Sequence, residues 1–142
     1  MTSPLRSTAA VVAGIAVIGI LSNGVDTVLE QSGVFPSIAE QREQGFRTPW
    51  MVALALAYRL LFAYVGGWLT ARFAPANPAK HVVVLIVIGT TLGALGAIAS
   101  WDVAPAWFTV LMLLGTPVAA WLGGMRVRRS REVRVPAVAL GR

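Results

Sequence analysis

The sequence predicts an all-α protein, an integral membrane bundle of four transmembrane helices with both chain ends in the cytoplasm (N-in/C-in). Of the 142 residues, 56% are hydrophobic and only 13% are charged, and the mean hydropathy is +0.71, well outside the composition of soluble domains. Four apolar runs are each long enough to cross a bilayer, since ~20 helical residues span ~30 Å of hydrocarbon. The basic residues are distributed unevenly around these runs, which predicts the orientation.

The apolar runs define the elements in order. They cover residues 8–29, 49–73, 81–101 and 105–125, and a basic tail of residues 126–142 follows. A polar segment separates the first two runs, whereas short turns follow the second and the third. Short connections make consecutive helices antiparallel neighbours. We therefore expect one membrane domain over residues 1–142, with no separate soluble domain.

The first run has a second interpretation, as a cleaved signal peptide with Arg6 as its basic region and residues 9–21 as its apolar core. No convincing small-x-small cleavage site follows, and the apolar character persists to Leu29. We therefore favour a transmembrane helix.

The orientation follows from the positions of Lys and Arg, which stay on the cytoplasmic side when they flank short loops. With both ends inside, the cytoplasmic segments hold Arg6, Arg72, Lys80, Arg126, Arg128, Arg129, Arg131, Arg134 and Arg142, against Glu132. The outer segments hold Asp26, Glu30, Glu40, Glu43 and Asp102, against Arg42 and Arg47. The five tryptophans fall at the ends of the predicted spans, as in an aromatic belt.

Arg59 lies near the middle of the second run, where a guanidinium costs at least ~2.5 kcal/mol unless it is paired or hydrated. In the first run, Asn23, Asp26 and Glu30 are spaced by three and four residues, so they share one helix face in its outer half. An ion pair between Asp26 and Arg59 is feasible because the arginine side chain is long. These four residues are the candidate ligand or ion-pair site.

Two interpretations of this pair stay open: a structural ion pair that fixes helix register, and a substrate or ion contact in an outward-facing polar cavity. Tyr58 points about 100° away from Arg59 around a helix, so we expect it to be a packing residue. His81 is expected to be a solvated residue at the inner boundary, not a metal ligand.

Small residues recur in the third run, where Gly89, Gly93 and Gly96 are spaced by four and three. Helices in lipid associate through small residues that allow close backbone approach. We expect a helix-packing face here, with Gly66 of the second run in its counterpart, and we favour contact within one chain over contact between chains. In the fourth run, Pro117 predicts a kink.

Two further features lie outside the spans. Ser37 to Glu40 matches a capping box and Gly45 a stop, which predicts a short extracytoplasmic surface helix over residues 38–44. This helix would be a lid over the polar face or, as we favour, a linker that lies on the membrane interface. We interpret the basic tail mainly as a solvated segment that flanks the fourth span. A second interpretation is that it binds anionic lipid head groups through Arg126, Arg128, Arg129 and Arg131.

Several functions lack support in the sequence. The net charge of +6 is concentrated beside a membrane span, which indicates anionic lipid as the partner and not nucleic acid. The chain has no cysteine, no Gly-rich phosphate loop, no His-Glu-x-x-His motif and no serine elbow. We therefore expect no enzyme activity, no cofactor and no metal.

Short motifs between residues 50 and 126 carry a resemblance. They are Tyr58-Arg59-Leu60, Gly66-Gly67-Trp68-Leu69-Thr70-Ala71-Arg72, Ala99-Ser100-Trp101-Asp102, Pro105-Ala106-Trp107, and Pro117 followed by Ala120-Trp121-Leu122-Gly123-Gly124. With these motifs the chain resembles a family of small uncharacterised bacterial inner-membrane proteins with four transmembrane helices. The resemblance implies the fold and a multi-pass location in the inner (cytoplasmic) membrane, and it implies no activity.

Two classes of function are therefore expected. The first is a structural or accessory membrane subunit, which docks with a membrane-protein partner and contains a buried Asp26–Arg59 pair. The alternative is a small oligomeric transporter or channel that uses Asn23, Asp26, Glu30 and Arg59 as an outward-facing polar site.

Overall fold

A computed structural model of the chain describes the backbone of residues 4–139 and the side chains of residues 4–130. Its elements are the helices α1 (Pro4–Gln31), α2 (Ile38–Gln44), α3 (Pro49–Phe73), α4 (Pro78–Ala99) and α5 (Ala106–Ala139). All but the short α2 are long and apolar enough to cross a membrane. The prediction of an all-α protein with four long apolar helices is confirmed.

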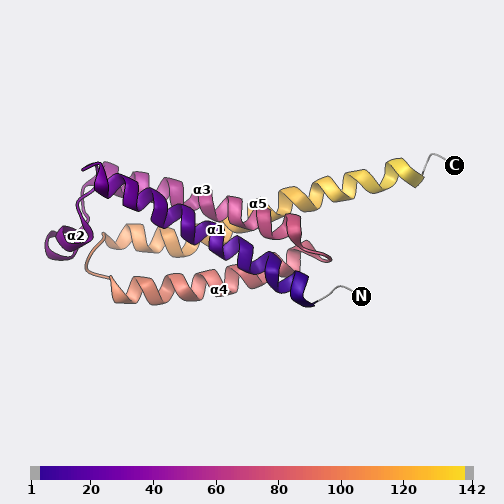
Figure 1. Cartoon of the computed structure of the whole chain (residues 1–142), viewed down its shortest axis with the longest axis horizontal. Helices are drawn as coiled ribbons and strands as arrows, with labels where there is room; N and C mark the ends of the chain where they lie inside the picture. Colours follow the sequence, from indigo (N-terminus) through magenta and orange to yellow (C-terminus); the bar gives the residue numbers. More distant parts are fainter. Residues whose placement is uncertain (1–3, 140–142) are drawn as a thin grey trace.

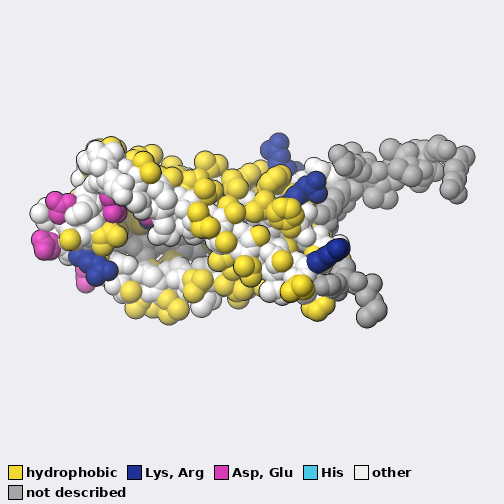
Figure 2. Space-filling model, viewed as in Figure 1, with side chains coloured by type: hydrophobic (Ala, Val, Ile, Leu, Met, Phe, Trp, Pro, Cys, Tyr) yellow, Lys and Arg dark blue, Asp and Glu magenta, His cyan; other side chains and the backbone are white. Residues whose placement is uncertain are grey.

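The four long helices run up and down beside one another (Figure 1). One end of the bundle carries α2 and the α4–α5 loop, and we call it the α2 end. The other end carries the α3–α4 turn and the start of α1, and we call it the turn end. Figure 2 shows acidic side chains at the α2 end, most of the visible basic side chains at the turn end, and hydrophobic surface between them.

Some helix boundaries differ from the predicted spans. Helix α4 begins at Pro78, not at His81, because proline fits the first turn of a helix, where its missing N–H is not needed. Helix α5 passes Pro117 without interruption and continues through the basic residues to Ala139. Arginine is a good helix former, so the change from apolar to basic residues marks a change of environment and not the end of the helix.

The short helix α2 has the predicted capping box. The Ser37 hydroxyl accepts a hydrogen bond from the Glu40 backbone N–H at 3.4 Å, and the Glu40 carboxylate accepts one from the Ser37 N–H at 2.7 Å. The Ser37 N–H and the Ser37 hydroxyl group both donate to the Glu40 carboxylate, and these two bonds hold the pKa of Glu40 below its ordinary value. Gly45 follows the helix with a φ of 80°, a conformation that favours glycine.

Helices α3 and α5 meet through their backbones. A Cβ atom on Gly67 would lie 2.0 Å from the carbonyl oxygen of Ala120, and one on Gly123 would lie 2.0 Å from that of Tyr64. Only glycine fits at such positions, and close backbone approach of this kind is the usual basis of helix association in lipid. Helix α3 is the centre of the bundle, since its buried residues are Val52, Ala55, Tyr58, Ala63, Gly66, Gly67, Thr70 and Ala71.

Near the turn end, helix α1 approaches α3 through a glycine in the same way, and near the α2 end it packs on α3 through the partly buried Val25 and Leu29. A Cβ atom on Gly14 would collide with the Thr70 hydroxyl at 2.0 Å and approach the carbonyl oxygen of Gly66 to 3.0 Å. The buried residues of α1 are Ala10, Val11 and Gly14, and those of α4 are Val82 and Leu85. Both sets lie toward the turn end, and α1 and α4 diverge from there toward the α2 end (Figure 1).

The expectation of an intrachain packing face on α4 needs correction. A Cβ atom on Gly89 or Gly96 would meet nothing within 4 Å, and one on Gly93 would meet only a Leu113 methyl group at 3.9 Å. Gly66 does pack closely, but its neighbours are Ile18 and Gly14 of α1. The small-residue spacing of α4 indicates room beside the helix, and the sequence alone does not say whether a neighbouring helix fills that room.

The loops at the α2 end are tied together across the bundle. The Phe46 N–H donates to the carbonyl oxygen of Val103 at 2.6 Å, and the Arg47 guanidinium donates to that of Asp102 at 3.3 Å. Phe35 packs edge-on against Phe46, with 5.0 Å between ring centroids. These contacts fix the α2–α3 linker against the α4–α5 loop and close the end of the bundle.

Candidate functional site

Between the diverging halves of α1 and α4 lies a cavity of about 600 Å³. Its walls come from α1, α4 and α5 with Arg59 of α3, and residues of α2 and the loops cover its end. The hollow is visible between α1 and α4 near the α2 end in Figure 2. A volume of this size matches the ~300–1,000 Å³ of pockets that bind small molecules.

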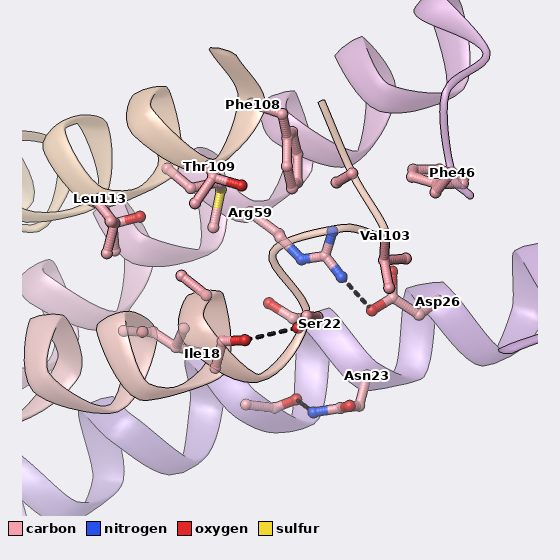
Figure 3. A pocket seen from close by; sticks show the side chains of 18 of the residues that line it. Ile18, Ser22, Asn23, Asp26, Phe46, Arg59, Val103, Phe108, Thr109 and Leu113 are labelled. Carbon is pink, nitrogen blue, oxygen red and sulfur yellow. Dashed lines mark hydrogen bonds and ion pairs between the residues drawn. The ribbon is translucent and has the colours of Figure 1, made fainter. Parts of the chain in front are cut away.

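Asp26 and Arg59 meet in the wall of this cavity. The Arg59 guanidinium donates from Nη2 to Oδ2 of Asp26 at 2.6 Å, a short charge-assisted hydrogen bond. Figure 3 shows the arginine side chain directed toward Asp26, with Phe108 and Thr109 on one side of it and Ser22 on the other. The side chains of Arg59 and Asp26 are 27% and 22% exposed, so this pair is accessible from the cavity.

Tyr58 belongs to the same cluster, which corrects its interpretation as a packing residue alone. Its hydroxyl group donates to Oδ1 of Asp26, and its ring is buried and lies 5.4 Å from the Arg59 guanidinium carbon. The two neighbours point in different directions from α3, but the long arginine side chain returns over the tyrosine ring to the same carboxylate. Both oxygens of Asp26 therefore bind α3, and this cluster joins α1 to α3 at the α2 end.

Glu30 lies one helical turn beyond Asp26, at the end of the cavity. Its carboxylate accepts a hydrogen bond from the Gln41 side-chain amide at 3.3 Å, and that amide also donates to the carbonyl oxygen of Pro36 at 2.7 Å. Ile38 and Gln41 of α2 both line the cavity. Helix α2 thus covers the end of the polar face, which fits the interpretation as a lid better than that of a linker that lies on the membrane interface.

Asn23 also lines the cavity, but its amide is engaged within α1, where it donates to the carbonyl oxygen of Gly19 at 2.8 Å. All four residues of the predicted polar site therefore border one cavity. Among them the structure places only Asp26 and Arg59 in direct contact, while Glu30 binds the covering helix.

The wall opposite α1 is built from the glycines of α4. Gly89, Gly93 and Gly96 all line the cavity, and their missing side chains create part of its volume. On α5, Thr116 also lines it, and its buried hydroxyl group has no hydrogen-bond partner among the described residues. Sequence reasoning missed the α5 wall, because Thr109, Met112 and Thr116 form no pattern distinct from an ordinary apolar helix.

The remaining predicted residues lie far from the cavity. Arg126, Arg128 and Arg129 are exposed on α5 at the turn end, and the side chain of Arg131 lies outside the described residues. His81 is half-buried, with Nδ1 3.2 Å from the carbonyl oxygen of Asn77. Within the described part of the chain, no group of three or more His, Asp or Glu residues could hold a metal ion.

Comparison with protein-family models, with curated proteins and with solved structures finds no match for this chain. The arguments about function therefore rest on the cavity itself. It combines a charged and hydrogen-bonding end with an apolar interior, an arrangement suited to binding an amphiphilic molecule.

Proposed function

We propose that this chain is a multi-pass protein of the bacterial inner membrane that binds a small molecule in the cavity between α1 and α4, as a small transporter, channel or binding protein. The observation that supports this function is the place of the Asp26–Arg59 pair. It lines a cavity of about 600 Å³ with both side chains partly exposed, whereas a pair that serves only to fix register would lie between packed helices.

The charge distribution supports an orientation with the α2 end outside. Arg6, Arg72, Lys80 and Arg126 all belong to the turn end, whereas Glu40, Glu43 and Asp102 belong to the α2 end. The positive-inside rule then places both chain ends in the cytoplasm and the cavity in the outer half of the bilayer. In this orientation the exposed arginines of α5 lie beside the anionic head groups of the inner leaflet.

One observation favours the alternative, a structural or accessory membrane subunit. The buried residues of α1 all lie toward the turn end, and at the α2 end α1 packs through the partly buried Val25 and Leu29, so the cluster of Tyr58, Asp26 and Arg59 strengthens the contact of α1 with α3 there. A subunit of this kind would dock with a membrane-protein partner or a second copy of itself. It would need the cluster for stability only, and the cavity would have no role.

A cavity-filling variant separates the two functions. Gly93→Leu places a side chain in the cavity, where a Cβ atom meets only Leu113 at 3.9 Å, and it replaces glycine with a better helix former. Gly24→Leu is the matched control, because Gly24 has open space around it and does not line the cavity. Thermal unfolding is measured for each variant with a panel of amphiphiles, since a ligand that binds the folded state raises Tm.

A binding function predicts compounds that raise the Tm of the wild type and of Gly24→Leu but not that of Gly93→Leu. If no compound distinguishes the two variants and Gly93→Leu complements a deletion strain fully, the cavity has no role and the accessory function replaces the binding function.

The orientation has its own test, which the absence of native cysteine makes simple. Single cysteines at Glu43 and at Ser130 are expected to react with a membrane-impermeant maleimide from outside and from inside the cell, respectively. The opposite labelling pattern would place the cavity in the inner half of the bilayer.

A further inference from the structure

The charges around the cavity do not balance. Among the described residues that line it, the charged side chains are Asp26, Glu30 and Arg59, so two carboxylates face one guanidinium. Both oxygens of Asp26 are engaged, one by Arg59 and one by the Tyr58 hydroxyl. The pair is therefore neutral, and the unbalanced charge belongs to Glu30.

Glu30 has only weak compensation in the structure. Its described hydrogen bond comes from a neutral amide, that of Gln41, at 3.3 Å. An ionised carboxylate can accept about four hydrogen bonds, and a partly buried one is stabilised most by a positive charge. The end of the cavity under α2 is thus complementary to a cation.

The other end of the cavity is mainly apolar and, among the described residues, carries no charge, although the hydroxyl groups of Thr90 and Thr116 also line it. Away from Glu30 its lining includes Ile18 of α1, Gly93 of α4, and Met112, Leu113 and Pro117 of α5. Ile18 and Glu30 are twelve residues apart on one helix, a rise of roughly 18 Å. The cavity is therefore elongated, with a single unbalanced negative charge at one end and an uncharged, mainly apolar lining at the other.

The cavity also lies open along its side, between α1 and α4 (Figure 2). The buried residues of these helices lie toward the turn end, so this opening would face the hydrocarbon core of a bilayer. A ligand that is already dissolved in the membrane would enter with its tail in lipid and its head group near the surface.

We infer that the ligand is a single-chain cationic amphiphile, which enters between α1 and α4 and places its ammonium head group against Glu30 and its alkyl chain against Ile18 and Met112. This inference rests on the proposed binding function and names the chemical class of its ligand. Arg59 and Asp26 shape the wall next to the head group and do not carry the charge preference.

The test uses three probes that share one tail: dodecyltrimethylammonium, dodecyl sulfate and dodecanol. Equilibrium binding is measured to full-length protein in phosphatidylcholine nanodiscs, with empty nanodiscs subtracted. The wild type is compared with Glu30→Gln and with Glu43→Gln, which removes the same charge from an exposed residue of α2 outside the cavity. Gly93→Leu is the filled-cavity variant.

The wild type is expected to bind the ammonium probe about tenfold more tightly than the sulfate, a difference of ~1.4 kcal/mol. Glu30→Gln should lose this preference, Glu43→Gln should keep it, and Gly93→Leu should bind none of the probes.

Equal binding of all three probes, or a preference for the sulfate, overturns the cationic ligand while the loss in Gly93→Leu still supports a binding cavity. An equal loss in Glu43→Gln also overturns the role of Glu30. If no probe binds the wild type above empty nanodiscs and Gly93→Leu is indistinguishable from it, both the ligand class and the binding function fail.

Discussion

Glycine has opposite effects in the two halves of this bundle. Toward the turn end, Gly14, Gly67 and Gly123 allow backbones to touch, and any side chain there would collide with a neighbouring helix. Toward the α2 end, Gly89 and Gly96 face open space and help to create a cavity. A small residue therefore permits close approach, but whether a neighbour takes the space depends on the course of the other helices.

The polar groups differ between the halves as well. In the packed half, the buried Thr70 hydroxyl has no hydrogen-bond partner among the described residues and lies against Gly14. In the open half, polar groups meet in the Asp26 cluster and in the contact of Glu30 with Gln41. Close backbone packing holds the half at the turn end, whereas the half at the α2 end combines a hydrophobic cluster around Phe35, Phe46 and Val52 with these electrostatic contacts.

The largest effect is expected for glycine substitutions in the packed half. Gly67→Ala should destabilise the fold by about 3 kcal/mol or more, because the new Cβ atom would lie 2.0 Å from the Ala120 carbonyl oxygen and α3 and α5 would have to separate. The matched change Gly96→Ala should instead stabilise α4 by up to ~1 kcal/mol. Denaturation in detergent followed by circular dichroism measures both, and equal effects would remove the contrast between the halves.

The next effect is expected for the ion pair in the open half. Asp26→Leu leaves the Arg59 charge without its partner and should cost about 1.5–3 kcal/mol. The double variant Asp26→Leu with Arg59→Met should recover much of this loss, because no isolated charge remains. The same unfolding measurement tests it. A double variant less stable than the single variant would show that Arg59 has a second essential partner.

A smaller effect is expected for the phenol group. Tyr58→Phe removes the hydrogen bond to Asp26 but keeps the buried ring, so it should cost ~1 kcal/mol. Tyr64→Phe, on the same helix toward the turn end, is the control and should change stability by less than ~0.5 kcal/mol. If both variants behave alike, the Tyr58 hydroxyl does not help to join α1 to α3.

The helices could be predicted from the sequence because long apolar runs have few other stable structures in a membrane. The approach of Asp26 to Arg59 could also be predicted. The depth of each residue in the membrane follows from its position in its span, and antiparallel packing of the two helices brings these depths close together. The role of Tyr58 could not be predicted. The angle between neighbouring residues of a helix gives the directions in which their side chains leave the backbone, but not the position of the guanidinium at the end of the long Arg59 side chain.

The partners of the glycines could not be predicted either. Gly123 of α5 contacts α3, and Gly124 contacts α4. Gly89, Gly93 and Gly96 are more regularly spaced, but among the described residues they contact almost no other helix. Sequence spacing gives the face of one helix, but contact depends on two helices and their crossing. The cavity is a property of that crossing, which is why no single motif predicted it.

The attachment of the two side walls has a mechanical consequence. Helix α1 is held to α3 at both ends, through Gly14 and through Asp26, whereas α4 is buried only near Val82 and Leu85. Toward Ala99, α4 lies against α5, and the described hydrogen bonds from other elements reach it through the loop that accepts from Phe46 and Arg47. From Leu85 to Ala99 the helix rises roughly 21 Å, so a tilt of about 5° would shift Ala99 by roughly 2 Å. Helix α4 is thus the cavity wall that a small tilt would move, and the Phe46–Val103 hydrogen bond opposes that tilt.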